Sequence, residues 1–225
     1  MRPQIKQFDA TEWPLLAARL IQDSINANLL ERGQCSVMLT GGRSAERLYT
    51  SWAELPAFRQ ITGVRFYFGD ERCVPPDHPD SNYGMAMRTL FQRGVPAGCS
   101  VFRMEADNPD REAAARHYGE ALPVKLDIIL LGVGEDGHIA SLFPGCAALQ
   151  EVSRMVVPVI SPKLPHERIT ITPPIIVKAR SVFVLAAGAA KAEVLSRALN
   201  ETGDISALPA RLVLRGTWLL DGTLI

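Results

Sequence analysis

The sequence predicts an α/β fold: a doubly wound, mostly parallel sheet flanked by helices. Short apolar segments alternate several times with polar loops and helical stretches, at a spacing typical of strand–loop–helix units. One of them, residues 127–131, ends in consecutive apolar residues, as is typical of a parallel strand covered on both faces. The length of 225 residues suits one large domain, so residues 1–225 are expected to form a single domain.

Composition argues against several classes of protein. Lysine plus arginine equals aspartate plus glutamate, 24 against 24, whereas a nucleic-acid-binding protein usually carries a basic excess that neutralises phosphates. No apolar run reaches the roughly 20 residues needed to cross a bilayer. Residues 1–7 also lack the apolar core of a signal peptide. We therefore expect neither a nucleic-acid partner nor a membrane partner.

The four cysteines are widely spaced and form no Cys-x-x-Cys pair. Free thiols in a reducing compartment fit this pattern better than a disulfide framework or a zinc site. The protein is therefore expected in the cytoplasm, with no bound metal. The cysteines are Cys35, Cys73, Cys99 and Cys146.

The first expected element is a helix from about residue 11 to residue 32. Thr11 is the expected cap of this helix, and Gly33 is placed to end it. The apolar side of the helix consists of Leu16, Leu20, Ile21, Ile25 and Leu29.

A short buried strand is expected next, over residues 35–40. A pair of glycines breaks it, and Ser44 is the expected cap of a helix from residue 45 to about residue 52. Residues 64–68 predict a second strand, followed by a polar, proline-rich loop over residues 69–80.

The remaining elements continue the alternation of strands and helices. Asp110 is the expected cap of a helix reaching residue 120. Residues 146–167 have no clear pattern and are placed only loosely. The other expected elements are a helix through Tyr83 and Leu90, strands at 100–104, 127–131, 155–160, 168–172 and 181–186, and a helix at 189–199.

Ligands of doubly wound sheets bind at the carboxyl ends of the strands. The loops that follow Thr40, Phe68, Leu131 and Ala186 are therefore expected to carry the function. In the first of them, Gly41 and Gly42 let the backbone approach a ligand, and the next helix directs free N–H groups at it. This combination suits a phosphate. An ordinary tight turn with a capping serine is the alternative.

Three consecutive charged residues, Asp70, Glu71 and Arg72, follow the second strand. Arg72 could bind a phosphate or carboxylate of a substrate with two parallel hydrogen bonds. A solvated turn whose charges pair with one another is the alternative.

The third loop, residues 132–138, has the Gly-x-Gly-x-x-Gly spacing of a dinucleotide-binding loop. That motif expects an acidic residue about 20 positions later, near Val157, and the surrounding residues include no carboxylate. The loop also lies beyond the middle of the chain, whereas the motif normally opens its domain. Dinucleotide binding is therefore a minor alternative.

The same loop contains an Asp-x-His pair, Asp136 and His138. A histidine there can act as a general base near neutral pH, and a nearby carboxylate can fix its tautomer. A structural, hydrogen-bonded histidine is the alternative. The other histidines show no metal-ligand spacing with His138, and the chain lacks the Gly-x-Ser-x-Gly motif of serine esterases.

Two cations in the second half of the chain are further candidates. Arg168 opens an expected strand, and Lys191 lies in the first turn of an expected helix. The helix dipole disfavours a lysine at that position, so a bound phosphate would explain it. An ordinary surface lysine is the alternative.

Taken together, these segments resemble the glucosamine-6-phosphate isomerase/6-phosphogluconolactonase family, and within it the lactonases. The resemblance covers nearly the whole chain. The matching segments are residues 40–42, 69–75, 80–83, 131–138, 140–144, 168–170, 188–191 and 218–221.

The resemblance implies a Rossmann-like fold, similar to that of glucosamine-6-phosphate deaminase. It also implies hydrolysis of 6-phospho-D-glucono-1,5-lactone in the pentose phosphate pathway, without a cofactor, a metal or a covalent intermediate. His138 would activate water, with Asp136 and Asp70 as the other catalytic residues. The implied phosphate site comprises Gly41, Gly42, Arg43, Ser44, Arg72, Arg168 and Lys191.

The first loop departs from the family pattern: residues 40–44 read Thr-Gly-Gly-Arg-Ser, where relatives usually read Ser-Gly-Gly-Ser-Thr followed by proline. Arg43 adds a cation close to the expected phosphate, and it either joins the phosphate site or points to solvent. A sugar-phosphate isomerase or deaminase and a non-catalytic sugar-phosphate sensor are the alternative functions. The protein is expected to be a monomer or a small homo-oligomer whose partner is the small-molecule lactone.

Overall fold

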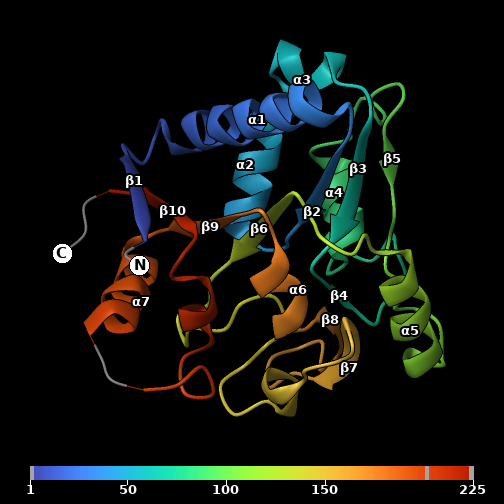
Figure 1. Ribbon diagram of the computed structural model, residues 1–225, viewed down its shortest axis with the longest axis vertical. Helices are drawn as coiled ribbons and strands as arrows, with labels where there is room; N and C mark the ends of the chain where they lie inside the picture. Colours follow the sequence, from blue (N-terminus) through green and yellow to red (C-terminus); the bar gives the residue numbers. More distant parts are fainter. Residues whose placement is uncertain (1–2, 201–202, 223–225) are drawn as a thin grey trace.

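The computed structural model describes residues 3–200 and 203–222 and contains two sheets (Figure 1). All neighbouring strands of the larger sheet are parallel, which confirms the predicted α/β fold. In spatial order its strands are β1 (Gln4–Phe8), β10 (Thr217–Asp221), β9 (Ser181–Ala187), β6 (Ile128–Gly132), β2 (Cys35–Leu39), β3 (Val64–Phe68) and β5 (Ser100–Val101).

The order of the strands reverses beside β2. From β2 the chain continues outward through β3 to β5, and it then returns to place β6 on the other side of β2. Such a reversal opens a crevice at the carboxyl ends of the two central strands. The smaller, antiparallel sheet, in the order β4 (Asp70–Arg72), β8 (Glu167–Ile171) and β7 (Val156–Ile160), begins two residues after β3.

Helices cover both faces of the parallel sheet. Alternate residues of a strand point to opposite faces. In β6, Ile128 and Leu130 therefore enter one buried cluster, and Ile129 and Leu131 the other. The first cluster includes residues of α1 (Trp13–Arg32), α2 (Arg43–Ala53), α3 (Pro56–Gln60) and α4 (Asn82–Arg88). The second includes residues of α5 (Arg111–Ala121), α6 (Pro173–Lys178), α7 (Ala189–Asn200), η1 (Ala147–Gln150), η2 (Pro209–Val213) and the smaller sheet.

The ends of α1 correct one prediction and confirm another. Thr11 does not cap the helix: its N–H and hydroxyl both donate to the Asp9 carboxylate, and Glu12 occupies the cap position without a side-chain hydrogen bond. Gly33 ends the helix as predicted. It has a φ of 69°, and its N–H donates to the Leu29 carbonyl over 2.8 Å.

The start of α2 also differs from the prediction. The helix begins at Arg43, so Ser44 lies in its first turn and is not the cap. Gly42 is the cap, with a φ of 93° that favours glycine. The predicted cap of α5 is confirmed, because the Asp110 carboxylate accepts from the Ala113 N–H over 2.9 Å.

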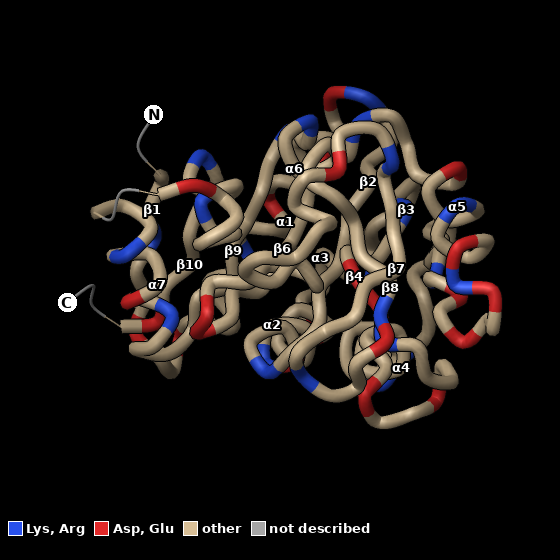
Figure 2. The backbone as a smooth tube through the Cα atoms, turned by 90° about the horizontal axis from the view of Figure 1, so that it is seen from below, with Lys and Arg blue, Asp and Glu red and all other residues tan. Residues whose placement is uncertain are grey.

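Several elements have no counterpart among the sequence predictions: β1, β4, β10, α3, α6 and the two 3₁₀ helices. The expected strand at residues 100–104 is shorter, comprising only Ser100–Val101. All four cysteines are free, as predicted. Basic and acidic residues are interspersed along the backbone (Figure 2). None of the described helices is both long enough and apolar enough to cross a membrane.

Candidate active site

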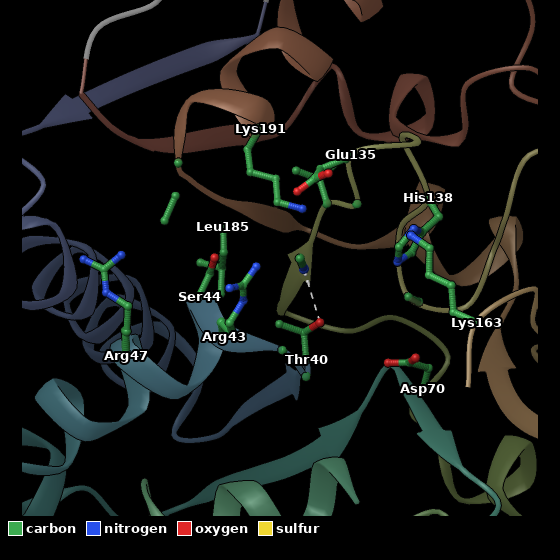
Figure 3. A pocket seen from close by; sticks show the side chains of 18 of the residues that line it. Thr40, Arg43, Ser44, Arg47, Asp70, Glu135, His138, Lys163, Leu185 and Lys191 are labelled. Atoms are coloured by element: carbon green, nitrogen blue, oxygen red, sulfur yellow. Dashed lines mark hydrogen bonds between the residues drawn. The ribbon is translucent and has the colours of Figure 1, made fainter. Parts of the chain in front are cut away.

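A cleft of about 630 Å³ lies at the carboxyl ends of the parallel strands, where the strand order reverses. The loops after β2 and β6 form its floor and are tied together, because the Gly132 N–H donates to Thr40 Oγ1 over 3.2 Å (Figure 3). Residues after β3 and β9 complete the walls. The four loops expected to carry the function therefore meet at one cleft.

Nine of the ten residues predicted for the site line this cleft. The tenth, Asp136, is hydrogen-bonded to one of them, His138. The nine are Gly41, Gly42, Arg43, Ser44, Asp70, Arg72, His138, Arg168 and Lys191.

His138 lies at one end of the cleft, on the tight loop after β6. The loop is closed by a hydrogen bond from the Gly134 N–H to the His138 carbonyl, 2.8 Å long. The imidazole stacks on the Phe143 ring, with 4.4 Å between the ring centroids. Its Nδ1 lies 2.5 Å from Asp136 Oδ1. The side chain keeps 19% of its surface exposed, so the ring is held in place but remains accessible from the cleft.

The protonation states of this pair suit a general base. Burial lowers the pKa of His138, although the hydrogen bond and the charge of Asp136 act in the opposite direction. Burial also disfavours the ionised form of Asp136, but the His138 hydrogen bond and the Lys163 ammonium outweigh it and lower its pKa to about 2. An ionised carboxylate only accepts, so Nδ1 carries the proton and Nε2 is left as the basic atom.

Asp70 is fixed at the same end of the cleft, and its side chain is almost fully buried. Its carboxylate accepts from the Ser141 hydroxyl over 2.6 Å and from Asn82 Nδ2 over 3.1 Å. Asn82 in turn fills the space beside Gly41, where any Cβ would overlap the Asn82 side chain. The first glycine of the pair is therefore required by packing against the residue that holds Asp70.

The other end of the cleft is suited to an anion. The amino terminus of α2 opens into it beside Gly41 and Gly42, with Ser44 in the first turn. Figure 3 shows the side chains of Arg43 and Lys191 reaching into the middle of the cleft from opposite sides. Burial lowers the pKa of Lys191, and Glu135 acts in the opposite direction.

The guanidinium groups of Arg72 and Arg168 donate to backbone carbonyls, although both residues line the cleft. Arg72 Nη1 donates to the Asp80 carbonyl over 2.5 Å. Arg168 Nε donates to the Pro165 carbonyl over 3.0 Å, and Nη1 lies 3.4 Å from the Ser141 hydroxyl. The role at the phosphate expected for these two arginines therefore stays a prediction.

Sequence reasoning missed Lys163 and Arg47. Lys163 Nζ lies 3.1 Å from Asp136 Oδ2, but it belongs to the segment that sequence patterns placed only loosely. Arg47 lines the anion end and pairs with Asp221 over 3.3 Å. Its position four residues after Arg43 on one helix was the available signal. Within the described residues, no three His, Cys, Asp or Glu side chains are grouped as metal ligands.

Comparison with known proteins places the chain among sugar-phosphate enzymes. A family model described as glucosamine-6-phosphate isomerases/6-phosphogluconolactonase matches residues 9–220. The chain belongs to this family. It is 40% identical to the 6-phosphogluconolactonase of Streptomyces coelicolor, over 91% of this chain and 86% of that protein.

Solved structures of the glucosamine-6-phosphate isomerase/6-phosphogluconolactonase family share the fold. The 6-phosphogluconolactonase of Trypanosoma brucei superposes with a TM-score of 0.82 at 31% identity, covering 98% of this chain and 96% of that one. A monomeric glucosamine-6-phosphate deaminase superposes with a TM-score of 0.83, covering 97% of each chain. At 21% identity, the deaminase supports the similarity of fold alone.

Proposed function

We propose that the chain hydrolyses 6-phospho-D-glucono-1,5-lactone to 6-phosphogluconate, a step of the oxidative pentose phosphate pathway. The chain is a hydrolase of the 6-phosphogluconolactonase type, as its family and its relatives at up to 40% identity indicate. One observation carries the proposal: a carboxylate-held imidazole and a cluster of backbone N–H and cationic groups occupy opposite ends of one cleft. The four free cysteines support the expected reducing, cytoplasmic compartment.

In the proposed mechanism, His138 Nε2 removes a proton from water as the water oxygen attacks the lactone carbonyl carbon. Asp136 holds the Nδ1 proton and stabilises the imidazolium that forms. The tetrahedral intermediate then collapses, the bond to the ring oxygen breaks, and that oxygen takes the proton of the His138 imidazolium to form an alcohol, which restores the neutral base. The product acid releases its proton to solvent, so neither a covalent intermediate nor a cofactor is required.

Asp70 is assigned to the reacting end with His138 and Asp136. Its buried carboxylate is fixed by Ser141 and Asn82 and faces the cleft, where it can accept a hydrogen bond from a substrate hydroxyl. Such a bond would orient the ring over the imidazole, which is how a positioned group raises the rate of attack.

The substrate phosphate is assigned to the other end. The backbone of Gly41 and Gly42, the amino terminus of α2 and the cations of Arg43 and Lys191 would bind it. Binding energy from a remote phosphate can hold the carbonyl in place for attack by water. The arrangement therefore accounts for cationic groups at a distance from the reacting atoms.

A lactone-hydrolysis assay, corrected for spontaneous hydrolysis, tests the function. The His138→Ala variant is expected to lose about two orders of magnitude or more in turnover, because it lacks the general base. Inorganic phosphate should still bind this variant. The control is His117→Ala, which removes an exposed histidine from α5 and should leave turnover unchanged. Equal turnover in the two variants would remove His138 from the mechanism.

The alternatives give different products in the same experiment. A deaminase would release ammonia from an amino-sugar phosphate, whereas the lactonase releases acid from the lactone. A sensor would bind the sugar phosphate without accelerating hydrolysis above the background rate. Acid release by the wild type that disappears in His138→Ala would distinguish the proposed activity from both.

A further inference from the structure

The loop between β7 and β8, residues 161–166, brings a third charged group to the His138–Asp136 pair. Lys163 Nζ lies 3.1 Å from Asp136 Oδ2, the carboxylate oxygen that His138 does not use. The ammonium also lies 5.9 Å from the centroid of the Phe143 ring, on which the imidazole stacks. Figure 3 shows Lys163 and His138 side by side at the end of the cleft.

The loop that carries Lys163 is internally bonded. The Ser161 hydroxyl accepts from the Lys163 N–H over 3.0 Å and donates to the Lys163 carbonyl over 2.8 Å. The Ser161 N–H donates to the His166 carbonyl over 2.7 Å, which closes the loop at its base. Lys163 therefore projects from a constrained backbone, although its own side chain is half exposed.

Arg168 holds the same loop from beneath. Its side chain is largely buried, and its guanidinium donates to three consecutive carbonyls, those of Lys163, Leu164 and Pro165, over 3.0 to 3.3 Å. A lysine on a flexible loop gains little from an exposed ion pair, because ordering the side chain costs entropy. Fixing the backbone on both sides of Lys163 reduces that cost.

We propose that Lys163 is a positioning residue for His138, and that Arg168 positions Lys163 and does not bind the substrate phosphate. This inference rests on the proposed function, in which His138 is the general base. Lys163 holds the Asp136 carboxylate by its second oxygen, so that the first oxygen stays aimed at Nδ1. The tautomer with a free Nε2 is thereby favoured.

The charge of Lys163 also acts on the imidazole. It opposes the imidazolium form, which keeps the base free at lower pH. The other charged groups around this end of the cleft come from several elements. Asp136 and Glu135 lie on the same loop as His138, and Lys191 on α7 lies near both of them. Asp70 comes from β4, and Arg168 comes from β8 and lies next to the Phe143 ring.

The first test is the pH profile of kcat/KM between pH 5 and 8, where the acid limb reports the loss of the neutral base. Lys163→Met removes the ammonium that opposes the imidazolium, so the acid limb should move to higher pH by roughly half a unit or more. Lys163→Arg keeps the charge and should stay close to the wild type. The control, Lys178→Met, removes an exposed lysine outside the cleft and should leave the profile unchanged.

The second readout does not require turnover. Titrating the His138 ring signals by NMR, assigned with the His138→Asn variant, should give a higher midpoint in Lys163→Met than in the wild type. An unchanged acid limb and midpoint in Lys163→Met would overturn the role of Lys163. A wild type that does not hydrolyse the lactone would overturn the proposed function instead, and the NMR titration would still test the contact.

Arg168 is tested with Arg168→Gln and the milder Arg168→Lys. Both variants weaken the hydrogen bonds that Arg168 donates to the loop carbonyls, so the acid limb of their pH profiles should shift in the same direction as in Lys163→Met. The double variant Lys163→Met/Arg168→Gln should show no larger shift than Lys163→Met alone. Inorganic phosphate should protect both Arg168 variants from thermal unfolding as well as it protects the wild type. Loss of that protection with an unchanged acid limb would make Arg168 a phosphate ligand and overturn this part of the proposal.

Discussion

The glycines of the loop after β6 have steric roles that differ from those in a dinucleotide-binding loop. A Cβ on Gly134 would overlap both His138 Nδ1 and Asp136 Oδ1, the two atoms of the short hydrogen bond. Gly137 has a φ of 82°, and a Cβ there would overlap the Leu208 side chain. Two glycines of the spacing that resembles a nucleotide motif are therefore explained without a nucleotide, Gly134 by the space the Asp-x-His pair needs and Gly137 by its φ and by Leu208.

This packing predicts the effect of a single methyl group. Gly134→Ala should reduce turnover by roughly 10- to 100-fold, because the methyl group separates Asp136 from His138, and misplacement of a catalytic group by about 1 Å can cost that much. Gly69→Ala is the matched control: Gly69 also follows a parallel strand, but a Cβ there has no neighbour closer than 3.6 Å. Lactone-hydrolysis rates of the two variants check the prediction, and comparable rates would contradict it.

The anion end of the cleft gives a prediction that is independent of turnover. Inorganic phosphate at ten times its Kd should stabilise the wild type by about 1.4 kcal/mol, which corresponds to a rise in Tm of roughly 3–6 °C. Lys191→Ala should lose most of this rise, whereas Lys178→Ala, outside the cleft, should keep it. Differential scanning fluorimetry measures both, and an equal rise in the two variants would remove Lys191 from the phosphate site.

Sequence reasoning located most of the site residues that follow parallel strands, and it missed Lys163, which comes from another segment. His138, Lys191 and the Gly41–Gly42 pair follow apolar strands, and the rule for parallel sheets places them together. Lys163 lies in an irregular loop, 27 positions after Asp136 in the sequence. No local pattern encodes that contact, because it depends on how Arg168 holds the loop.

At the scale of elements, Glu71 joins β4 to the start of α4. Its buried carboxylate accepts from the backbone N–H groups of Arg72, Asn82 and Tyr83 and from the Ser81 hydroxyl. Burial raises the pKa of Glu71, and the backbone hydrogen bonds act in the opposite direction. This junction positions Asn82, which in turn holds Asp70.

Glu71→Gln should therefore destabilise the fold. Whichever way the amide turns, at least one backbone N–H loses its acceptor, and a buried unsatisfied donor costs about 1–3 kcal/mol. Glu54→Gln is the control, because Glu54 is an exposed partner of Arg59 and Arg93 whose ion pairs contribute little. Urea unfolding should show a lower midpoint for Glu71→Gln with an unchanged slope. Equal midpoints in the two variants would show that the junction contributes nothing to stability.

The sequence predicted correctly the elements that the hydrophobic pattern determines. It missed elements and misplaced helix caps that depend on contacts with distant segments. Residues 128–131 are apolar and lie in β6, whose two faces are both covered, and the strand predicted at 127–131 is confirmed within one residue at each end. β1 has no buried residue and is defined by its pairing with β10. Thr11 and Ser44 are good capping residue types, but their backbone positions lie off the helix starts.

At the scale of the whole molecule, the first and last strands lie side by side. β1 pairs with β10 in parallel, at one edge of the sheet (Figure 1). The Trp13 indole at the start of α1 donates to the Leu219 carbonyl of β10 over 2.9 Å. Contacts between the two ends of the sequence therefore contribute to the same sheet that carries the cleft.

We expect residues 1–225 to unfold as one domain, because the two buried clusters share every central strand of the parallel sheet. Trp218 lies in one cluster and Trp13 and Trp52 in the other, all three fully buried. The fluorescence of Trp218→Phe therefore reports on one cluster and that of the double variant Trp13→Phe/Trp52→Phe on the other. In each variant, the urea unfolding transition followed by fluorescence should coincide with the transition followed by far-UV circular dichroism on the same protein. Fluorescence and dichroism midpoints that differ within either variant would indicate that the two faces of the sheet unfold separately, and would contradict a single domain.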